Sequence, residues 1–546
     1  MEAATVKDLV QSGTTAGIWK PTKGRFDAGV AWIPYVLAVF FSLSALRGVG
    51  STDVVDTDAA RHAMNGAFIY DMVRGGHIMH PIEYAKQYYG HLPALTMPYH
   101  PPMFPAIEAL FFSLLGVKLL AARAAVAISV GISVLLLYSL VQATLGSRIL
   151  ATCVTVTTLS LWTFRVVSRD VMLEFPALAF TLAALYCLRD MDRSFTVRRA
   201  LLFGVLAAAA VWTKQHTVFL GAMPFLCVMR KGQRHLFLEK PLWIGTAIFT
   251  TAVLCLMALS KQGNNTGIDQ VSTSARDVYW ILTATIPAYL TWIATDLKGF
   301  AGVFMLSAIV IHLGARRKRS LGALRLEIYF SWIVSYGFVL LVLGDTNSRY
   351  LFFVYPAFVT IGYAWLFQGC TSLWGERRAR FVMGGFAITW LAVGFLVPRE
   401  FLRGPGEAAA FVTSGSPARI LYAGEADGNF IFSIRSFDPQ LLMTVIPAGK
   451  LPAATFEPDA LESFCRQFGV DWIVFENVQR KLPWSHLADA RPAYLKLERS
   501  FPIASSRSRW RTGTIDVYRL NAPANPPGGV LQLPVYKLGG TIGVKF

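Results

Sequence analysis

Residues 119–145 read LLAARAAVAISVGISVLLLYSLVQATL, an apolar run interrupted by a single charge, Arg123. A helix needs about 20 apolar residues to cross the hydrocarbon core of a bilayer, and this run is longer than that. Similar apolar runs occupy residues 30–46, 242–260 and 382–397. The sequence therefore predicts a mainly α-helical protein that crosses a membrane several times.

The composition supports this interpretation, and the charge pattern gives the orientation. Of the 546 residues, 54% are hydrophobic and 15% charged, and the mean hydropathy is +0.46. A net charge of +18 in a soluble protein would favour a nucleic-acid partner. Here the basic residues gather in short loops between apolar runs, which is typical of cytoplasmic loops, so we expect no nucleic-acid partner. The clusters are Arg189/Arg193/Arg198/Arg199, Arg230/Lys231/Arg234/Lys240, Arg316/Arg317/Lys318/Arg319 and Arg377/Arg378/Arg380.

With each basic cluster placed in the cytoplasm, residues 30–398 form a membrane domain of about 11 spans. Residues 1–29 are polar, lack a cleavable signal pattern and are predicted to be a cytoplasmic tail. Residues 48–100 form a long outer loop. Residues 200–229 fit two short spans broken at 213–216, because a lysine deep in a bilayer is costly unless it lines a polar cavity. We expect the stretch 278–297 to be an outer interfacial helix or lid.

The composition becomes more polar at residue 399, which predicts a separate domain over residues 399–546. An odd number of spans places this domain outside the cytoplasm. Strand-like and helical patterns alternate in it, which is typical of a small α/β domain. We expect strands at 419–423, 441–446, 471–475 and 514–520, a helix at 459–468, a linker at 404–406 and a loose tail at the C-terminal end. The six cysteines have neither CxxC nor metal-ligand spacing, so we expect neither a disulfide framework nor a cysteine-ligated metal.

Several residues of the first outer loop could carry chemistry. Asp56 and Asp58 precede a predicted helix that begins near Ala59, and Asp58 fits an N-cap by local pattern. A carboxylate that caps a helix can still present an oxygen to a cleft. Arg61 and His62 follow in the helix. Farther along, His100 stands before two prolines, where a histidine is more often structural than catalytic.

The later outer turns add a carboxylate and two cations. Glu174 begins a predicted span and is therefore a functional candidate, although it also fits an interfacial residue solvated by headgroups. Lys214 lies in the predicted break. Arg349 and Tyr350 also fit a snorkelling anchor beside an aromatic belt residue. Because all these residues fall on one membrane face, they predict a polar cleft for an anionic, membrane-held substrate.

These segments resemble a known family. Residues 58–66, Tyr88-Tyr89-Gly90 and His100-Pro101-Pro102 look like the first outer loop of bacterial family 39-type membrane glycosyltransferases of the GT-C fold class. That family includes relatives of the protein O-mannosyltransferases and of the lipid A aminoarabinose transferase. Residues 172–176, 213–214 and 348–350 follow in the order that the family uses. The resemblance covers roughly residues 30–398 and implies a protein of the bacterial plasma (inner) membrane.

The sequence departs from the family pattern at three positions. The family commonly has an Asp-Glu pair where this chain has Asp58-Ala59, which leaves Asp56 and Asp58 both open as the catalytic carboxylate. Asp58 is favoured because it keeps the spacing to the Arg-His pair. The second outer carboxylate is often Asp and is Glu174 here, and Gln215 replaces a usual glycine.

The resemblance implies a sugar donor carried on a polyprenyl phosphate and an acceptor hydroxyl on a lipid, a glycan or a protein. Lys214 or Arg349 would stabilise the phosphate leaving group, Asp58 would act as base in one inverting displacement, and Glu174 would position acceptor or sugar. The resemblance implies no cofactor and no metal, although a carboxylate pair can bind a divalent ion. The further residues assigned to substrate binding are Arg61, His62, His100 and Tyr350.

Two other functions remain open at this point. A ligase or polymerase that transfers a whole lipid-linked glycan would also suit a large outer domain. A transporter or flippase would instead favour charges inside the spans and an inverted repeat between the two halves of the chain.

Overall fold

The computed structural model describes residues 31–189, 191, 195–229, 234–262, 278–315, 326–343, 346–478, 483–485, 492–506, 512–521, 528–535 and 540–545. The expected cytoplasmic tail at 1–29 and the basic cluster at 316–319 lie outside these residues.

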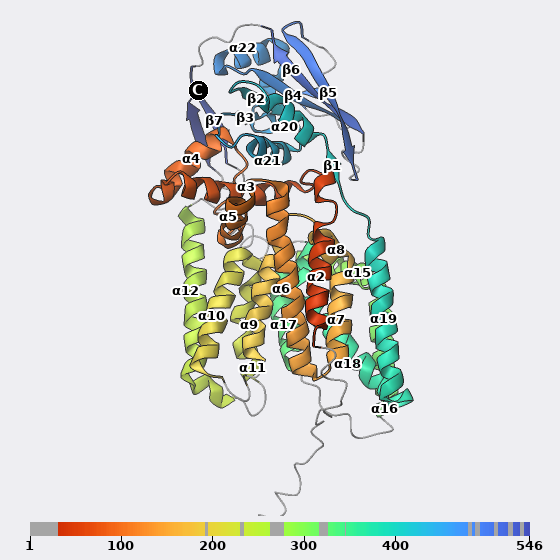
Figure 1. Cartoon of the computed structure of the whole chain (residues 1–546). Coiled ribbons are helices and arrows are strands. Elements are labelled where there is room, and N and C mark those ends of the chain that lie inside the picture. Colours follow the sequence, from red (N-terminus) through yellow and green to blue (C-terminus); the bar gives the residue numbers. More distant parts are fainter. Residues whose placement is uncertain are drawn as a thin grey trace, which may run out of the picture.

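Residues 33–396 form a bundle of helices, with a smaller domain stacked on one end (Figure 1). The first half of the bundle contains α2 (Ile33–Leu46), α5 (Met103–Leu115), α6 (Leu119–Leu145), α7 (Arg148–Ser160), α8 (Trp162–Val167), α9 (Glu174–Leu188) and α10 (Val197–Thr213). The second half contains η4 (Gln215–Gly221), α11 (Met223–Val228), η5 (Arg234–Leu238), α12 (Lys240–Gln262), α14 (Val278–Trp280), η6 (Ile281–Thr285), α15 (Ile286–Asp296), α16 (Lys298–Ala315), α17 (Glu327–Leu343), η7 (Ser348–Phe353), α18 (Tyr355–Trp374) and α19 (Glu376–Leu396).

Five helices in the described residues are long and apolar enough to cross a membrane: Ile33–Ser51, Leu119–Leu145, Lys240–Ser260, Val278–Asp296 and Glu376–Leu396. The first, third and fifth of them match apolar runs that the sequence singles out, and 119–145 is α6 itself. The apolar window of α6 is 67% buried, whereas the windows of the other four are 11–22% buried. We conclude that α6 is the central helix, and the number of spans, about 11, stays a prediction.

The predicted break at residues 213–216 is confirmed. Helix α10 ends at Thr213, Lys214 adopts an extended conformation with φ −149° and ψ 121°, and a 3₁₀ segment follows.

The stretch 278–297 is helical, and its C-terminal end lies against the starts of α8 and α18, because Asp296 Oδ2 accepts hydrogen bonds of 2.7 Å from Thr163 and Tyr355. The length and composition of this stretch fit a span as well as the predicted lid.

Helices α3 (Thr57–Arg74) and α4 (Pro81–His91) cover the end of the bundle that carries the smaller domain, which we call the outer end (Figure 1). The short 3₁₀ turns η2 (Val49–Ser51) and η3 (His77–Met79) flank α3. The N-cap of α3 is Asp56, whose Oδ1 accepts the backbone N–H of Asp58 at 2.8 Å. The prediction that Asp58 caps this helix was therefore wrong, because the helix begins two residues before Ala59.

The first half of α3 is buried on every side, from Ala59 to Phe68. The reason is that α3 packs between α5 of the bundle and α21 (Asp427–Phe437) of the smaller domain, which we call the outer domain. Polar residues of α3 consequently meet partners from both domains.

The outer domain is α/β, as predicted. Its six-stranded sheet has the order β1-β5-β6-β4-β2-β3, with β2 parallel to β3 and β4, and β6 antiparallel to β4 and β5. The strands are β1 (Leu402–Arg403), β2 (Arg419–Ala423), β3 (Thr444–Pro447), β4 (Trp472–Val478), β5 (Leu495–Ser505) and β6 (Gly513–Leu520). The helices are α20 (Pro405–Thr413), α21 (Asp427–Phe437) and α22 (Pro458–Phe468), with short 3₁₀ turns η8 (Ala448–Lys450) and η9 (Ala453–Phe456).

Two predictions about this domain were wrong. Residues 404–406 are not a linker: Pro405 starts α20, and the Gly406 N–H donates to Asp53 Oδ2 at 2.9 Å. The C-terminal end is not a loose tail, because β7 (Val530–Pro534) and β8 (Thr541–Lys545) pair antiparallel and pack on α4. The Tyr89 hydroxyl donates to the Pro534 carbonyl at 2.7 Å. Glycines and prolines around these short strands conceal their alternating pattern.

Candidate active site

A buried carboxylate organises the outer end of the bundle. Glu174 opens α9, and its side chain is 1% exposed. Its Oε1 lies 2.6 Å from Lys214 Nζ and 3.2 Å from Arg349 Nε. The lysine contact is a hydrogen bond, whereas the Arg349 Nε–H is not directed at the carboxylate and that contact is an ion pair without a hydrogen bond. A buried carboxylate is stable when it is paired in this way.

The two cations come from two connections between α-helices of the bundle. Lys214 lies in the extended residue between α10 and η4. Arg349 lies in the first turn of η7, where Asn347 Oδ1 accepts its backbone N–H at 3.0 Å. Such interruptions of helices at membrane depth are tolerated where they line a polar or protein-buried region.

Asp58, in the first turn of α3, is the fourth charged residue of this group. Its Oδ2 lies 3.5 Å from an Arg349 terminal nitrogen, and both side chains are about one quarter exposed, at 25% and 23%. Four residues far apart in the sequence thus form a continuous chain of charges: Lys214, Glu174, Arg349 and Asp58. We call this set the ionic cluster. Its existence agrees with the sequence-based expectation that these residues converge.

Tyr350 and His216 flank the cations. Lys214 Nζ lies 5.7 Å from the centre of the Tyr350 ring, within the range of a cation–π contact. The His216 ring packs against Tyr350 with a centroid distance of 4.4 Å. Tyr350 therefore lies in the region where the sequence predicts it.

Asp56 and the histidines lie beside the cluster rather than in it. Asp56 caps α3, and its own backbone N–H donates to Asp170 Oδ2 at 2.9 Å. The rings of His62 and His100 pack edge to face, with centroids 4.5 Å apart. The segment that carries His100 is held near the break in α10, since Gln215 Nε2 donates to the Tyr99 carbonyl at 3.0 Å.

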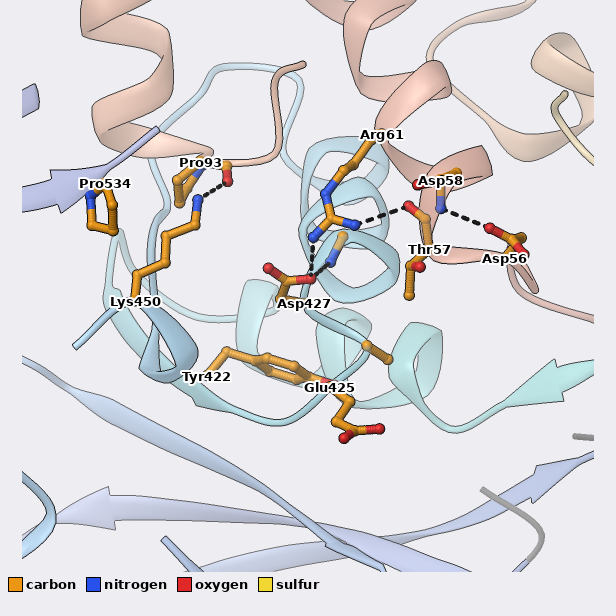
Figure 2. Close-up of polar contacts among 12 residues, drawn as sticks. Asp56, Thr57, Asp58, Arg61, Pro93, Tyr422, Glu425, Asp427, Lys450 and Pro534 are labelled. Atoms are coloured by element: carbon orange, nitrogen blue, oxygen red, sulfur yellow. Dashed lines mark hydrogen bonds and ion pairs between the residues drawn. The ribbon is translucent and has the colours of Figure 1, made fainter. Parts of the chain in front are cut away.

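Arg61 points away from the ionic cluster and into the outer domain. One of its terminal nitrogens lies 3.0 Å from Asp427 Oδ1 at the start of α21, as Figure 2 shows. Arg61 is thus engaged with the outer domain, and the expectation that it binds substrate stays a prediction.

The outer domain is fastened to α3 and α4 by contacts that the sequence gives no sign of. Arg435 of α21 forms a buried two-pronged ion pair with Asp71 of α3, at 2.5 and 2.8 Å, and the Tyr88 hydroxyl donates to the same carboxylate at 3.0 Å. Lys450 Nζ donates to the Pro93 carbonyl at 2.7 Å (Figure 2). The Asp71–Arg435 and Pro93–Lys450 contacts each join residues more than three hundred positions apart, which no local pattern reveals.

In the part of the chain that the structure describes, no group of three or more His, Cys, Asp or Glu side chains is placed to hold a metal ion. The chemistry available at the ionic cluster is therefore that of two cations, a buried carboxylate and a partly exposed carboxylate. Lysine and arginine carry several N–H donors each; Lys214 donates to Glu174 and Arg349 donates to Asp58, which uses part of them. The arrangement can bind an oxyanion next to Asp58.

Part of the chain matches a known protein family, and its fold is similar to solved structures. Residues 99–260 match the family described as dolichyl-phosphate-mannose-protein mannosyltransferase. The structure of ArnT from Cupriavidus metallidurans bound to undecaprenyl phosphate is similar with a TM-score of 0.56 and 15% identity, over 91% of this chain and 100% of that one.

The chain has a GT-C-type fold. The apo state of the same ArnT gives a TM-score of 0.55 at 14% identity, over 91% of this chain and 99% of that one. AglB, an archaeal oligosaccharyltransferase from Archaeoglobus fulgidus in complex with an inhibitory peptide and a dolichol-phosphate, gives 0.52 at 10% identity, over 88% of this chain and 75% of that one. No curated protein matches the sequence. At these identities the likeness establishes the GT-C fold, and the expectation of that fold is confirmed.

Proposed function

We propose that this GT-C chain is a membrane glycosyltransferase that moves a sugar from a polyprenyl phosphate to an acceptor hydroxyl at its outer end. The observation that carries the proposal is the ionic cluster, in which Glu174 holds Lys214 and Arg349 beside Asp58. The family match over residues 99–260 includes Glu174 and Lys214 and supports the same reaction class. The ArnT structure is bound to undecaprenyl phosphate and the AglB structure is a complex with a dolichol-phosphate, which supports a lipid phosphate as carrier.

The cations act on the leaving group. When the sugar departs, the bond between the anomeric carbon and the phosphate oxygen breaks, and the electron pair stays on that oxygen. Donors already directed at the place where this charge develops lower the barrier. Lys214 and Arg349 supply such donors, and Glu174 keeps both in position through the ground state and the reaction.

This assigns Glu174 a role different from that expected from the sequence. A carboxylate that is 1% exposed and engaged by two cations is poorly placed to position an acceptor or a sugar. We assign Glu174 as a positioning residue for the cations.

Asp58 is the proposed base. As the acceptor oxygen attacks the anomeric carbon, its proton passes to the Asp58 carboxylate, which contributes about 10²–10⁴-fold in reactions of this type. A single displacement inverts the anomeric centre. Asp58 is preferred to Asp56 because Asp56 caps α3, while Asp58 faces Arg349.

The proposed orientation places the outer end on the extracytoplasmic side of a bacterial inner membrane. In Figure 1 the turns between α6 and α7 and between α18 and α19 lie at the opposite end from the sheet domain. The second turn is followed directly by the basic residues Arg377, Arg378 and Arg380, which are typical of a cytoplasmic loop.

Native mass spectrometry of the purified protein tests the proposed carrier. We expect a co-bound polyprenyl phosphate in the wild type and its loss in the double variant Lys214→Met/Arg349→Met. Retention of the lipid by that variant would show that the cations do not hold the phosphate. Incubation with donor and acceptor then reports the mass of the product, where a whole glycan in place of one sugar would identify a glycan ligase.

A further inference from the structure

A basic hollow lies at the outer end of the bundle, apart from the ionic cluster. It has a volume of about 410 Å³ and is formed by the loop after α2, the start of α6, the turn between α8 and α9, and the chain that follows α19. One acidic residue, Glu400, lines it. Five arginines line it as well: Arg47, Arg123, Arg169, Arg399 and Arg403.

Arg123 is the innermost of these residues. Its side chain lies in the first turn of α6 and is only 4% exposed. Within the described residues its Nε makes no hydrogen bond, and the same holds for Arg169 Nε. A buried donor without a partner costs about 1–3 kcal/mol, so a ligand that accepts these hydrogen bonds would be stabilised here.

One carboxylate beside this hollow, that of Asp170, interacts with Arg123 and is also held by backbone groups. Asp170 accepts the backbone N–H groups of Asp56 and Val171, both at 2.9 Å. Asp53 accepts the Gly406 N–H at 2.9 Å.

The arginines themselves are oriented by neutral backbone groups. Arg169 donates to the Val397 carbonyl at 3.1 Å, and Arg403 Nε donates to the Ser51 carbonyl at 2.8 Å. Burial, followed by the neighbouring charges of Arg399 and Arg47, lowers the pKa of Arg169. The hollow therefore concentrates positive charge that its own carboxylates do not balance.

The surroundings indicate where the balancing anion comes from. Next to the hollow, one ring of α2 meets one ring of α19, since Phe40 and Phe395 are in edge-to-face contact at 5.6 Å. Both helices expose large apolar side chains there, including Leu43 at 62% and Leu396 at 80%. Apolar chains can lie on this surface while a headgroup reaches the arginines.

From these observations we propose that the arginine hollow binds the phosphate group of an anionic membrane lipid. Arginine suits this role because its planar guanidinium donates two parallel hydrogen bonds to phosphate oxygens. The site is distinct from the ionic cluster, since it shares none of the four residues of that cluster. It lies next to the start of α3, which carries Asp58, because Asp170 joins the turn that contributes Arg169 to Asp56, the cap of α3.

Lipid binding to the full-length protein tests the proposal. The test variant is Arg47→Gln/Arg399→Gln, which removes two exposed arginines of the hollow. The matched control is Arg377→Gln/Arg378→Gln, which removes two exposed arginines at the other end of α19. With phosphatidylglycerol titrated into detergent and followed by native mass spectrometry, we expect about tenfold weaker binding in the test variant and unchanged binding in the control.

Two further binding measurements identify the source of the phosphate. Phosphatidylcholine, which is zwitterionic, should bind less tightly than phosphatidylglycerol to the wild type, and inorganic phosphate at millimolar concentration should compete only weakly. Equal lipid binding by test and control variants would overturn the proposal. Saturable binding of inorganic phosphate that depends on Arg47 and Arg399, without lipid binding, would overturn the lipid as the source. Arg123→Gln serves as a second test variant, with thermal unfolding as the check on folding.

Discussion

The Lys214 ammonium lies 2.6 Å from Glu174 Oε1, although forty positions separate the two residues. The lysine follows α10 at the point where that helix breaks, and the glutamate opens α9. Neither charge would be stable alone in this buried position. Their pairing explains why the chain interrupts a helix at this depth, and it fixes one of the two donors that we assign to the lipid phosphate.

Replacing Lys214 should impair use of the donor more than it impairs the fold. Lys214→Met leaves Glu174 paired with Arg349, so the protein should still be recovered from the membrane in folded form. We expect kcat/KM for the lipid-phosphate donor to fall by about 10²-fold. Lys496→Met, which removes a lysine that is 63% exposed in the outer domain, should leave kcat/KM unchanged. Equal donor kinetics in both variants would contradict the role of Lys214.

The pairing of Glu174 can be measured by a double-mutant cycle. Glu174→Gln alone leaves two cations near each other without their carboxylate, and we expect it to destabilise the protein by about 3–5 kcal/mol. Adding Lys214→Met should recover part of that loss, because one uncompensated charge is then removed. The measurement is the change in apparent Tm in detergent. Additive effects of the two substitutions would show that the residues do not interact.

The ion pair between Asp71 and Arg435 should hold the outer domain on α3. Arg435→Met removes the cation that pairs with the buried Asp71 carboxylate and leaves the Tyr88 hydroxyl as its remaining side-chain donor. We expect this substitution to destabilise the protein by about 3–5 kcal/mol. Hydrogen–deuterium exchange should rise in α3 and α21 and stay constant in α6. Arg466→Met is the control, since Arg466 pairs with Glu462 on the surface of α22. Unchanged exchange in α3 would contradict the assignment.

Much of the fold follows from the sequence, and the reasons differ by element. Long apolar runs such as residues 119–145 require helices whatever their neighbours, so α6 is predictable. The break at Lys214 is predictable because the cost of a charge at that depth is local. The hairpin of β7 and β8 is not, because its short strands are stabilised by packing on α4.

The sequence likewise predicts some features of the candidate site and leaves others open. Membrane topology places Asp58, Glu174, Lys214 and Arg349 on one face, which is enough to predict their convergence. It cannot give the direction of each side chain. Arg61 turns to Asp427 because the outer domain covers α3, and that contact depends on tertiary packing.

The carboxyl of Asp53 provides a pH-dependent prediction. Burial raises the pKa of Asp53 from 3.8 to about 6, against the opposing effect of the Gly406 N–H. Between pH 4 and 6 the folded state then binds more protons at this residue than the unfolded state, so the contribution of Asp53 to stability falls as the pH rises. The difference in Tm between wild type and Asp53→Asn should change in that interval and be constant above pH 7. A difference that stays constant from pH 4 to 7 would contradict this prediction.

The most direct test of the account compares sugar transfer by Asp58→Asn and Asp56→Asn. Asparagine caps helices about as well as aspartate, so Asp56→Asn should retain α3 and lose less than about tenfold in kcat. Asp58→Asn should lose about 10²–10⁴-fold in kcat while binding the polyprenyl-phosphate donor as the wild type does. Turnover by Asp58→Asn at the wild-type rate would contradict the proposal that Asp58 is the base.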